Sequence, residues 1–202
     1  MRVLVACEFS GVVRDAFNDF GHDAWSCDLL DTERPGKHYV CDVLDVVDQG
    51  WDLMVAHPPC TYLSVSGLHW NKKRPERQAQ TAAAYEFFMA LWNAPIPRIA
   101  IENPVGCMST LWRKPDQIIQ PYEFGEDASK STCLWLKGLP LLKPTGRFPG
   151  RWVLHKGKYV ERWSNQTDSG HNKLPPSEDR WALRSVTYEN IASAMAAQWR
   201  TL

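Results

Sequence analysis

Short apolar runs alternate with helix-like stretches over the first hundred residues of the chain. The run at residues 3–7 is rich in β-branched side chains, which is typical of a strand buried on both faces. Similar runs at 23–27, 38–41, 52–56 and 98–101 predict four further strands. Strands and helices that alternate in this way predict an α/β fold with a Rossmann-like, doubly wound and mostly parallel sheet.

Three helices are expected from their end signals and from the spacing of their apolar residues. The first spans residues 10–20, with Ser10 as its N-cap. The second spans residues 75–92 and opens on Pro75, which suits the first turn of a helix. The third spans residues 187–199 and begins with a threonine cap. Apolar residues recur in it at three- and four-residue intervals, so one of its faces is expected to be buried.

The second half of the chain is less regular. Residues 153–155 and 158–162 predict a hairpin that turns at Lys156-Gly157. We therefore expect the doubly wound sheet to carry a small basic hairpin and loop appendage. The predicted parts are a Rossmann-like catalytic and cofactor-binding domain (1–142), a small basic-aromatic insertion (143–180) and a C-terminal helix that returns to the catalytic domain (181–202).

Composition agrees with this division and adds a local charge. The chain has 202 residues, 44% of them hydrophobic, as expected for one compact domain with a small appendage. Its formal net charge is zero, but residues 143–180 carry eight Lys and Arg against four Asp and Glu. A basic segment with interleaved Trp152, Tyr159 and Trp163 is typical of a nucleic-acid surface, although an ordinary solvated surface can have the same composition.

Other residue patterns exclude some classes of protein. The chain contains no apolar run of about 18 residues, so we expect no membrane span. Its first apolar run reaches Glu8, which a signal peptide would avoid, so we expect a cytoplasmic protein. No cysteines have CxxC spacing and no histidines have metal-ligand spacing, so we assign no metal. Three cysteines at the ends of apolar runs are expected to be buried thiols: Cys7, Cys27 and Cys41.

Polar residues, glycine or cysteine follow each of the five predicted strands. Ligands bind at the carboxyl ends of the strands in open α/β sheets, so these residues are candidates for a site. They are the run Phe9-Ser10-Gly11, Asp28, Asp42, the run Pro58-Pro59-Cys60 and the run Glu102-Asn103.

The first strands point to an adenosine-containing cofactor. Gly11 would let a ligand approach the backbone, and Asp28 would accept hydrogen bonds from ribose hydroxyls. Asp42 could contact an adenine amine, although simple solvation of loop carboxylates is an alternative explanation for both aspartates. Val13 and Arg14 stand where further glycines would help a pyrophosphate approach, so S-adenosylmethionine is favoured over a dinucleotide.

The later strands point to covalent chemistry. Cys60 lies on a rigid Pro-Pro turn, where a thiolate is a strong nucleophile, although a structural cysteine could also occupy this position. Glu102 is expected to have a raised pKa in a half-buried cleft and to act as a proton donor; alternatively it ends a strand without a chemical role. Asn103 would orient Glu102 or the substrate.

These motifs occur in the order found in the C5-cytosine DNA methyltransferases, and the chain resembles that family over residues 3–106. The resemblance rests on Phe9-Ser10-Gly11, on Pro-Pro-Cys followed by Ser64 four residues after Cys60, and on Glu102-Asn103-Pro104. Residues 188–199 look like the family's last motif, a helix that completes the cofactor pocket.

The resemblance implies a mechanism. Cys60 would add to C6 of a cytosine while Glu102 protonates N3, and C5 would take a methyl group from S-adenosylmethionine. The base must leave the duplex stack to reach such a site. The implied catalytic residues are Cys60, Glu102, Asn103 and Ser64. The implied cofactor-binding residues are Phe9, Ser10, Gly11, Asp28, Asp42 and Pro58.

The implied partner is DNA, either a duplex with a flipped cytosine or a single strand. Residues 61–74 look like the family's mobile catalytic loop, and their cations would suit phosphates, although a solvated helix start would also carry them. The implied nucleic-acid contacts are Lys72, Lys73, Arg74, Lys130, Arg147, Arg151, Lys156 and Lys158. We expect a monomer or a weak homodimer.

The sequence departs from the family at several points. Cys7 replaces an aspartate, and Lys130 is the one cation where the family has arginines that contact the base. The large target-recognition domain is absent, which suggests a phage or mobile-element protein in a bacterial cytoplasm, such as a restriction-modification enzyme. Two alternatives therefore stay open: a catalytically degenerate module that binds nucleic acid or cofactor, and a pyrimidine-modifying enzyme that acts on RNA or free nucleotides.

Overall fold

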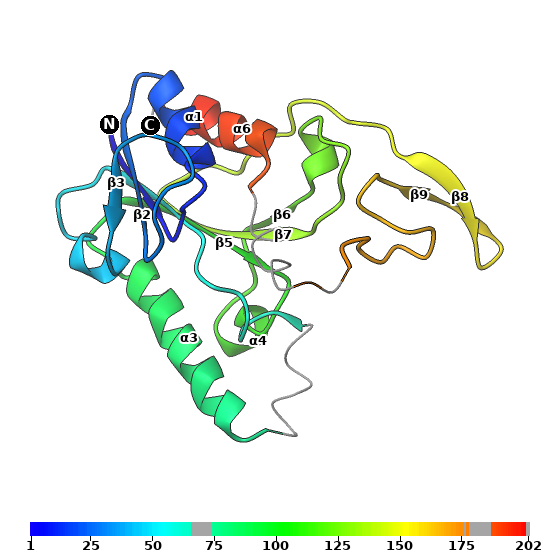
Figure 1. Ribbon diagram of the computed structural model, residues 1–202, viewed down its shortest axis with the longest axis horizontal. Coiled ribbons are helices and arrows are strands. Elements are labelled where there is room, and N and C mark those ends of the chain that lie inside the picture. The colour runs from blue at the N-terminus through cyan, green and yellow to red at the C-terminus, as the bar shows by residue number, and fades with distance from the viewer. Residues whose placement is uncertain (66–73, 176, 178–186, 201–202) are drawn as a thin grey trace.

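The computed structural model describes residues 1–65, 74–175, 177 and 187–200 (Figure 1). The described strands are β1 (Arg2–Ala6), β2 (Asp23–Asp28), β3 (His38–Val40), β4 (Leu53–Ala56), β5 (Arg98–Pro104), β6 (Gln117–Ile119), β7 (Thr132–Lys137), β8 (Arg151–His155) and β9 (Lys158–Arg162). The described helices are α1 (Val12–Asp19), α3 (Glu76–Trp92), α4 (Met108–Leu111) and α6 (Glu189–Trp199), with 3-10 turns η1 (Val43–Asp45) and η3 (Pro121–Glu123).

Seven of the described strands form one sheet, in the order β3-β2-β1-β4-β5-β7-β6. Strands β1 to β5 run parallel to one another, whereas β7 is antiparallel to both β5 and β6. The predicted fold class, a Rossmann-like and mostly parallel α/β sheet, is therefore confirmed. The strand order reverses between β1 and β4, and ligands bind in such sheets at the carboxyl ends beside this switch point.

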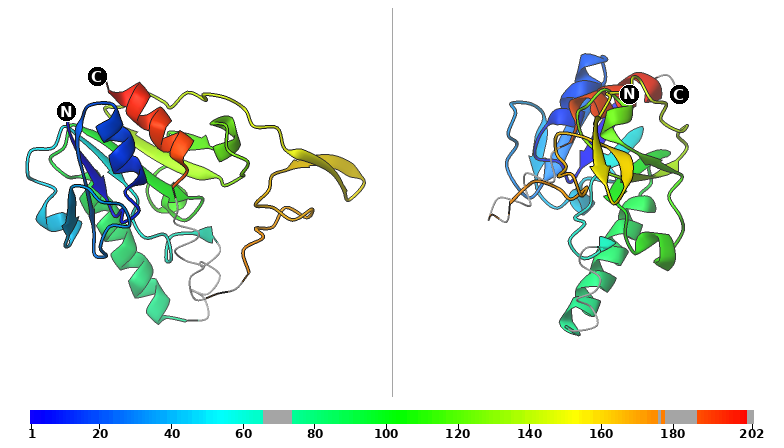
Figure 2. Two further views of the ribbon diagram at one scale, coloured as in Figure 1. Left: turned by 45° about the horizontal axis from the view of Figure 1, so that its top comes forward. Right: turned by 90° about the vertical axis from the view of Figure 1, so that its right-hand side faces the viewer.

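The core lies in two layers because successive residues of each buried strand point to opposite faces. Val3 and Val5 of β1 pack on the side of α1 and α6, whereas Leu4 and Ala6 pack on the side of α3. Figure 2 shows α1 and α6 side by side on one face of the sheet, with α3 on the other. Within the described part of the chain, no helix has the length and apolar character that a membrane span requires.

The five predicted strands are present within one to three residues of their expected ends. Two predicted helix caps are wrong. Ser10 is not the N-cap of α1, because Gly11 holds that position in a left-handed conformation with φ of 74°. The predicted threonine cap of α6 is also wrong, because Tyr188 is the N-cap and no side chain caps that helix. Sequence reasoning missed α4, β6 and β7.

The guanidinium of Arg14 is fully buried and fixes the connection between β2 and β3. It forms an ion pair with Asp15, at 2.8 Å. Its remaining acceptors, at 3.0 to 3.3 Å, are Ser26 Oγ, Thr32 Oγ1 and the carbonyl oxygens of Arg34 and Pro35. A buried cation with this many acceptors is stable, so it clamps the loop before β3 onto α1.

The predicted hairpin is present as β8 and β9, and it turns at Lys156-Gly157 as expected. Both turn residues have positive φ angles, 50° for Lys156 and 76° for Gly157, as a two-residue hairpin turn with the strand twist requires. The two strands form a sheet of their own, which projects beside the main sheet (Figure 1).

Candidate active site

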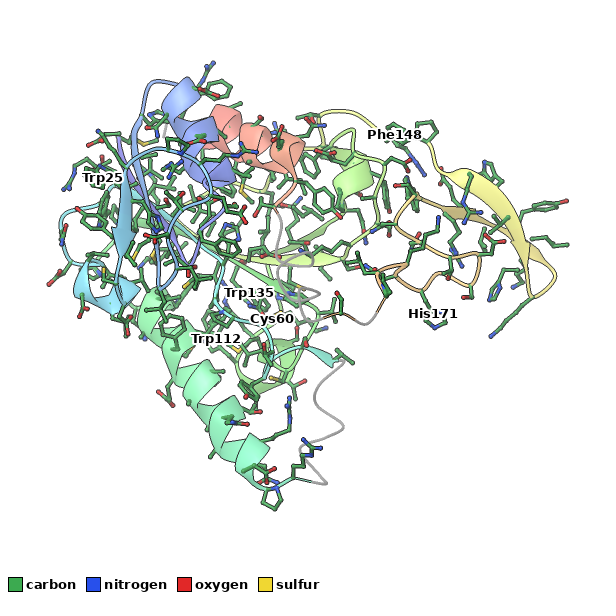
Figure 3. The ribbon with its side chains drawn as sticks, in the orientation of Figure 1. Trp25, Cys60, Trp112, Trp135, Phe148 and His171 are labelled. Atoms are coloured by element: carbon green, nitrogen blue, oxygen red, sulfur yellow. The ribbon has the colours of Figure 1, made fainter. Side chains whose placement is uncertain are left out.

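The Pro-Pro-Cys segment leaves the carboxyl end of β4 and is tied to β5 by a side chain. Asn103 is only 1% exposed, and its Nδ2 donates a hydrogen bond to the Pro58 carbonyl oxygen, at 2.8 Å. Pro58 is buried, whereas Cys60, which is labelled in Figure 3, is exposed. Asn103 Oδ1 is buried and has no hydrogen-bond partner among the described residues, so the role of Asn103 toward Glu102 or a substrate stays a prediction. Asn103 holds the start of the segment that presents Cys60.

Backbone contacts fix the other end of this segment. The Cys60 carbonyl oxygen accepts hydrogen bonds from the amides of Leu63 and Ser64, at 3.1 and 2.9 Å. Ser64 then forms a β-bridge with Gly106, just beyond β5. A Cβ atom at residue 106 would lie 2.0 Å from the Leu63 carbonyl oxygen, so this approach requires glycine. The segments that follow β4 and β5 are therefore held together on both sides of Cys60.

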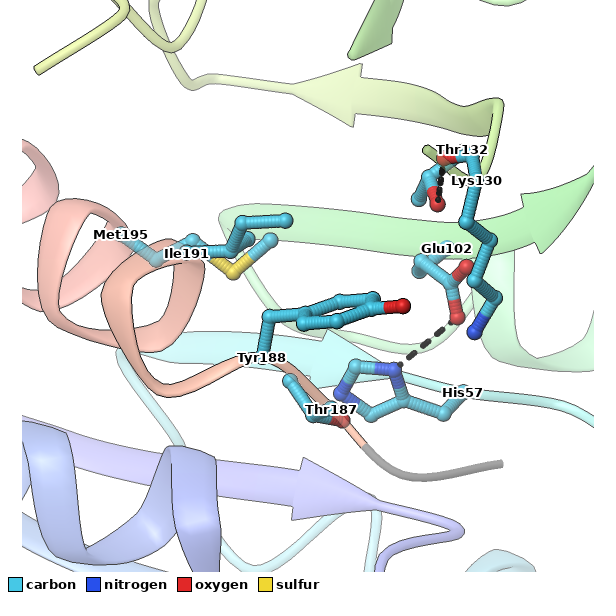
Figure 4. A pocket seen from close by; sticks show the side chains of 8 residues that line it. All are labelled: His57, Glu102, Lys130, Thr132, Thr187, Tyr188, Ile191 and Met195. Atoms are coloured by element: carbon cyan, nitrogen blue, oxygen red, sulfur yellow. Dashed lines mark hydrogen bonds and ion pairs between the residues drawn. The ribbon is translucent and has the colours of Figure 1, made fainter. Parts of the chain in front are cut away.

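A histidine that sequence reasoning did not assign lies next to Glu102. The parallel register pairs Ala56 of β4 with Ile101 of β5, so the next residues, His57 and Glu102, lie side by side. His57 Nδ1 is 3.2 Å from Glu102 Oε2, and the two side chains are 13% and 19% exposed (Figure 4). His57 directly follows the predicted strand 52–56, and Glu102 directly follows the predicted strand 98–101. Had these two strands been placed next to each other, the sequence would have indicated that His57 lies beside Glu102.

The predicted rise in the pKa of Glu102 is wrong. Burial alone raises the pKa of this carboxyl, but the hydrogen bond from His57 and the positive charges of Lys130 and His57 outweigh it. The resulting pKa lies below the ordinary value, so Glu102 is a carboxylate at neutral pH. A group in this state accepts hydrogen bonds rather than donating a proton.

His57 and Glu102 border a small cavity of about 20 Å³ between the sheet and the start of α6 (Figure 4). The Lys130 side chain extends toward Glu102 in this view, and His57 Nε2 is buried with no hydrogen-bond partner among the described residues. The other residues that line the cavity are Thr132, Thr187, Tyr188, Ile191 and Met195. A carboxylate, an ammonium and an imidazole therefore converge on an apolar wall, around a space that holds about one water molecule.

The predicted cofactor aspartates gather around the end of β1. Cys7 directly follows this strand with φ of 57°, a left-handed conformation that is uncommon for cysteine. Burial raises the pKa of the Cys7 thiol, and the nearby carboxylates of Asp28 and Asp42 raise it further. Asp28 Oδ1 accepts a hydrogen bond from the Leu30 amide, at 3.1 Å, and Asp42 caps η1. The structure therefore brings both aspartates to one edge of the sheet.

The start of α1 is closed by a side chain of this protein. The Glu8 carboxylate is 4% exposed and accepts hydrogen bonds from the amides of Val13 and Arg14, at 2.7 and 3.2 Å. The space beside Gly11 is also filled, because a Cβ atom there would lie 2.5 Å from an Arg14 guanidinium nitrogen. A pyrophosphate does not fit a helix start that already holds a carboxylate, whereas the aspartates of β2 and β3 suit the hydroxyls and amine of an adenosine.

Three further predicted cofactor residues have local partners. The Phe9 carbonyl oxygen accepts a hydrogen bond from the Glu33 amide, at 2.8 Å, and Ser10 Oγ donates one to Glu8, at 3.2 Å. Phe9 and Ser10 are half-buried at the same edge of the sheet as Pro58. Their roles toward a cofactor stay predictions.

The predicted nucleic-acid contacts fall into separate places. Lys72 and Lys73 lie outside the described residues, Arg74 precedes α3, and Lys130 lies at the cavity. Two arginines are engaged within the protein: Arg147 pairs with Glu161, and Arg151 pairs with Asp168 at 2.6 Å. Lys156 and Lys158 are exposed and form no ion pair within the described part of the chain.

Comparisons with known proteins give structural likenesses only. No family model matches the chain, and no curated protein matches it. It is similar to an Escherichia coli protein assigned as a DNA modification methyltransferase encoded within a prophage, with 13% identity, a TM-score of 0.47, and 74% of this chain and 52% of that chain covered. It is also similar to the 16S rRNA methylase RmtB, with 16% identity, a TM-score of 0.36, and 67% and 55% covered. The chain spans about half the length of these two proteins.

Proposed function

We propose that this chain, whose sheet has the Rossmann-like methyltransferase fold, transfers a methyl group to C5 of cytosine in DNA, with Cys60 as the nucleophile. The observation that carries the proposal is the pairing of β4 with β5. This pairing sets the Pro-Pro-Cys segment beside Glu102, and Asn103 fastens the two strands' ends together at Pro58. A thiol and a carboxylate held this way suit addition to a pyrimidine ring.

In the first step, the Cys60 thiolate forms a bond to C6 of the cytosine. The electron pair of the C5–C6 double bond moves toward C5 and N3, and N3 takes up a proton. Glu102, as a carboxylate, accepts hydrogen bonds from protonated N3 and from the N4 amine, and Lys130 donates to O2. Because the pKa of Glu102 is lowered, we assign the source of the proton to the His57 side of the pair or to water.

S-adenosylmethionine, when bound, supplies the methyl group that C5 receives. Asp28 and Asp42 would hold its ribose and adenine, with Phe9, Ser10 and Pro58 at the same sheet edge. The transfer would leave S-adenosylhomocysteine, and the proton that N3 took up would return to its donor. A base then removes the C5 proton. The Cys60–C6 bond then breaks, its electron pair returns to sulfur, and the ring recovers its double bond. No atom of the protein is consumed in this cycle.

The test is transfer of labelled methyl groups from S-adenosylmethionine to duplex DNA, single-stranded DNA, RNA and dCMP. We expect label in DNA with the natural chain and with Cys41→Ala, which removes a thiol away from β4 and β5, but none with Cys60→Ala. DNA that contains 5-fluorocytosine should trap a covalent complex, since C5 then has no proton to lose. Equal transfer by Cys60→Ala and the natural chain would overturn the proposal.

A second candidate function is binding without turnover. It is favoured by Glu8 and Arg14, whose side chains fill the turn after β1 where the resembled family has open glycines. In that case calorimetry would detect S-adenosylmethionine or DNA binding while no label is transferred to any of the four substrates. Label in RNA or dCMP alone would favour a pyrimidine-modifying enzyme with another substrate.

A further inference from the structure

The hairpin of β8 and β9 presents one face of large exposed side chains. Its register pairs Trp152 with Glu161 and Leu154 with Tyr159, so Trp152, Leu154 and Tyr159 lie on the same face. We call these three residues the hairpin face. They are 67%, 64% and 73% exposed, respectively. Clustered exposed apolar side chains of this size mark a binding surface more often than an ordinary solvated one.

The hairpin carries more basic than acidic side chains. The two strands and their turn hold one acidic residue, Glu161, whose carboxylate is engaged by Arg147 and by the Gly150 amide. At the turn, Lys156 is exposed at the end of the hairpin face, whereas Lys158 pairs with His155 and lies on the opposite face of the hairpin. The basic residues of the hairpin are Arg151, Lys156, Lys158 and Arg162. An apolar face with cations at its edge is complementary to a ligand with flat rings and a phosphate backbone.

We propose that the hairpin face binds single-stranded DNA by stacking on unpaired bases, with Lys156 and Lys158 contacting phosphates. A duplex offers its phosphates and its base edges but keeps the faces of its bases stacked on one another. Trp152 and Tyr159 can stack only on bases that have left such a stack. The choice of DNA as the ligand rests on the proposed function. The test of the inference, however, measures only DNA binding and does not require methyl transfer.

The root of the hairpin is rigid. The Trp163 ring, just after β9, stacks on Tyr122 with ring centroids 4.0 Å apart and an interplanar angle of 8°. Trp163 Nε1 donates a hydrogen bond to the Phe148 carbonyl oxygen, at 3.1 Å. The Arg147 guanidinium lies over both rings, 5.2 Å from the Tyr122 centroid and 5.8 Å from that of Trp163. The hairpin face is therefore presented from a fixed base.

The same root is fastened to the segment that carries Lys130 to the cavity. Asn165 Nδ2 donates to the Ser129 carbonyl oxygen, and Asn165 Oδ1 accepts from the Ser129 amide, both at 3.0 Å. Ser129 directly precedes Lys130, which lines the cavity with Glu102. A DNA strand bound on the hairpin face would thus be held by a hairpin whose base is attached, through Asn165 and Ser129, to the segment that carries Lys130.

The test measures binding of a fluorescent dodecamer of thymidine and cytidine by anisotropy, as a single strand and annealed to its complement. The protein carries Cys60→Ala and no cofactor is added, so turnover plays no part. We expect the single strand to bind more tightly than the duplex. Trp152→Ala with Tyr159→Ala should weaken single-strand binding by about tenfold or more, with a smaller effect on the duplex.

Two controls make the result specific. Trp152→Phe keeps a flat ring and should restore most of the affinity that Trp152→Ala loses. Phe20→Ala removes an exposed ring at the end of α1, away from the hairpin, and should leave affinity unchanged. Circular dichroism checks that each variant is folded, which is expected because the altered side chains are largely exposed.

Wild-type affinity in the Trp152→Ala, Tyr159→Ala variant would overturn the inference, as would equal loss of single-strand and duplex binding. The outcome is separable from that of the proposed function. If the natural chain methylates DNA but the variant binds the single strand as tightly as the natural chain, only the inference is wrong. If the single strand binds through the hairpin face but no methyl group is transferred, only the proposed function is wrong.

Discussion

At the scale of single residues, the contact between His57 and Glu102 determines the protonation state of the carboxyl group at the cavity. A buried carboxyl without a partner would be neutral at pH values where an ordinary glutamate is charged. Here the histidine on the adjacent strand and the ammonium of Lys130 reverse that tendency. The chemistry of Glu102 is therefore set by two residues that come from other elements.

Replacing His57 should change the acid stability of the protein. The pKa of Glu102 is lower in the folded chain than in the unfolded chain, so the pair stabilises the fold above the unfolded pKa, and this contribution is lost as the pH falls through the folded pKa. We expect His57→Ala to raise the pKa of Glu102 and to lower the free energy of unfolding at pH 7 by about 1–3 kcal/mol. Urea unfolding at pH 7 and pH 3.5 measures this; the deficit should shrink at the lower pH, and His155→Ala should show none.

Asn103 is a positioning residue whose loss should separate catalysis from cofactor binding. Asn103→Ala leaves the buried Pro58 carbonyl oxygen without its donor, which should cost about 1–3 kcal/mol of unfolding free energy. The segment that carries Cys60 would then move relative to Glu102. We expect methyl transfer to fall by about a hundredfold, while calorimetry shows a much smaller loss of S-adenosylmethionine affinity, because Pro58 is one of several residues proposed to hold the cofactor. Equal losses in both measurements would contradict this role.

At the scale of elements, α1 begins on a carboxylate rather than on a conventional cap. Glu8 accepts hydrogen bonds from the amides of Val13 and Arg14 from a buried position, three residues before the N-cap Gly11. Glu8→Ala would leave two buried donors without an acceptor. We expect the free energy of unfolding to fall by about 1–3 kcal/mol, with Glu8→Gln intermediate because it keeps one acceptor. Glu33→Ala, which removes an exposed carboxylate nearby, should change thermal stability little.

The predicted strands and the missed strands differ in their direction relative to their neighbours and in what bounds them along the chain. Strands β1 to β5 are bounded by helices or turn residues, so their apolar runs are read directly from the sequence. Strand β7 is antiparallel and pairs with both β5 and the three-residue β6, so the alternation of strand and helix does not apply there. Lys130 was predicted only as a nucleic-acid contact, because nothing local indicates that the segment before β7 brings it to Glu102. His57 was missed because its partner is distant in sequence.

At the scale of the whole molecule, the chain is electrically neutral but its hairpin is not. The predicted phosphate contacts Arg147 and Arg151 already pair with Glu161 and Asp168, so they hold the hairpin rather than extend from it. The exposed cations of the hairpin that form no ion pair within the described residues are Lys156 and Lys158. A neutral protein with one basic projection is expected to bind DNA through that projection.

Neutralising the turn should therefore change the salt dependence of DNA binding. We expect Lys156→Gln with Lys158→Gln to reduce the slope of log affinity against log salt by about 1.4, which corresponds to two phosphate contacts on a single strand. Anisotropy titrations between low and moderate salt give this slope. Lys114→Gln with Lys143→Gln, which removes two cations outside the hairpin, is the matched control and should leave the slope as in the natural chain.

The Arg14 clamp also bears on the thermodynamics of ligand binding. In a glycine-rich loop, the backbone has many conformations, and a ligand must select one of them. Here a guanidinium with acceptors on three loop residues has already selected the conformation during folding. When an adenosine binds beside Asp28, this loop is therefore already ordered. The binding should carry only a small loss of conformational entropy of the protein. The loop behaves as a preorganised receptor rather than as one that closes around its ligand.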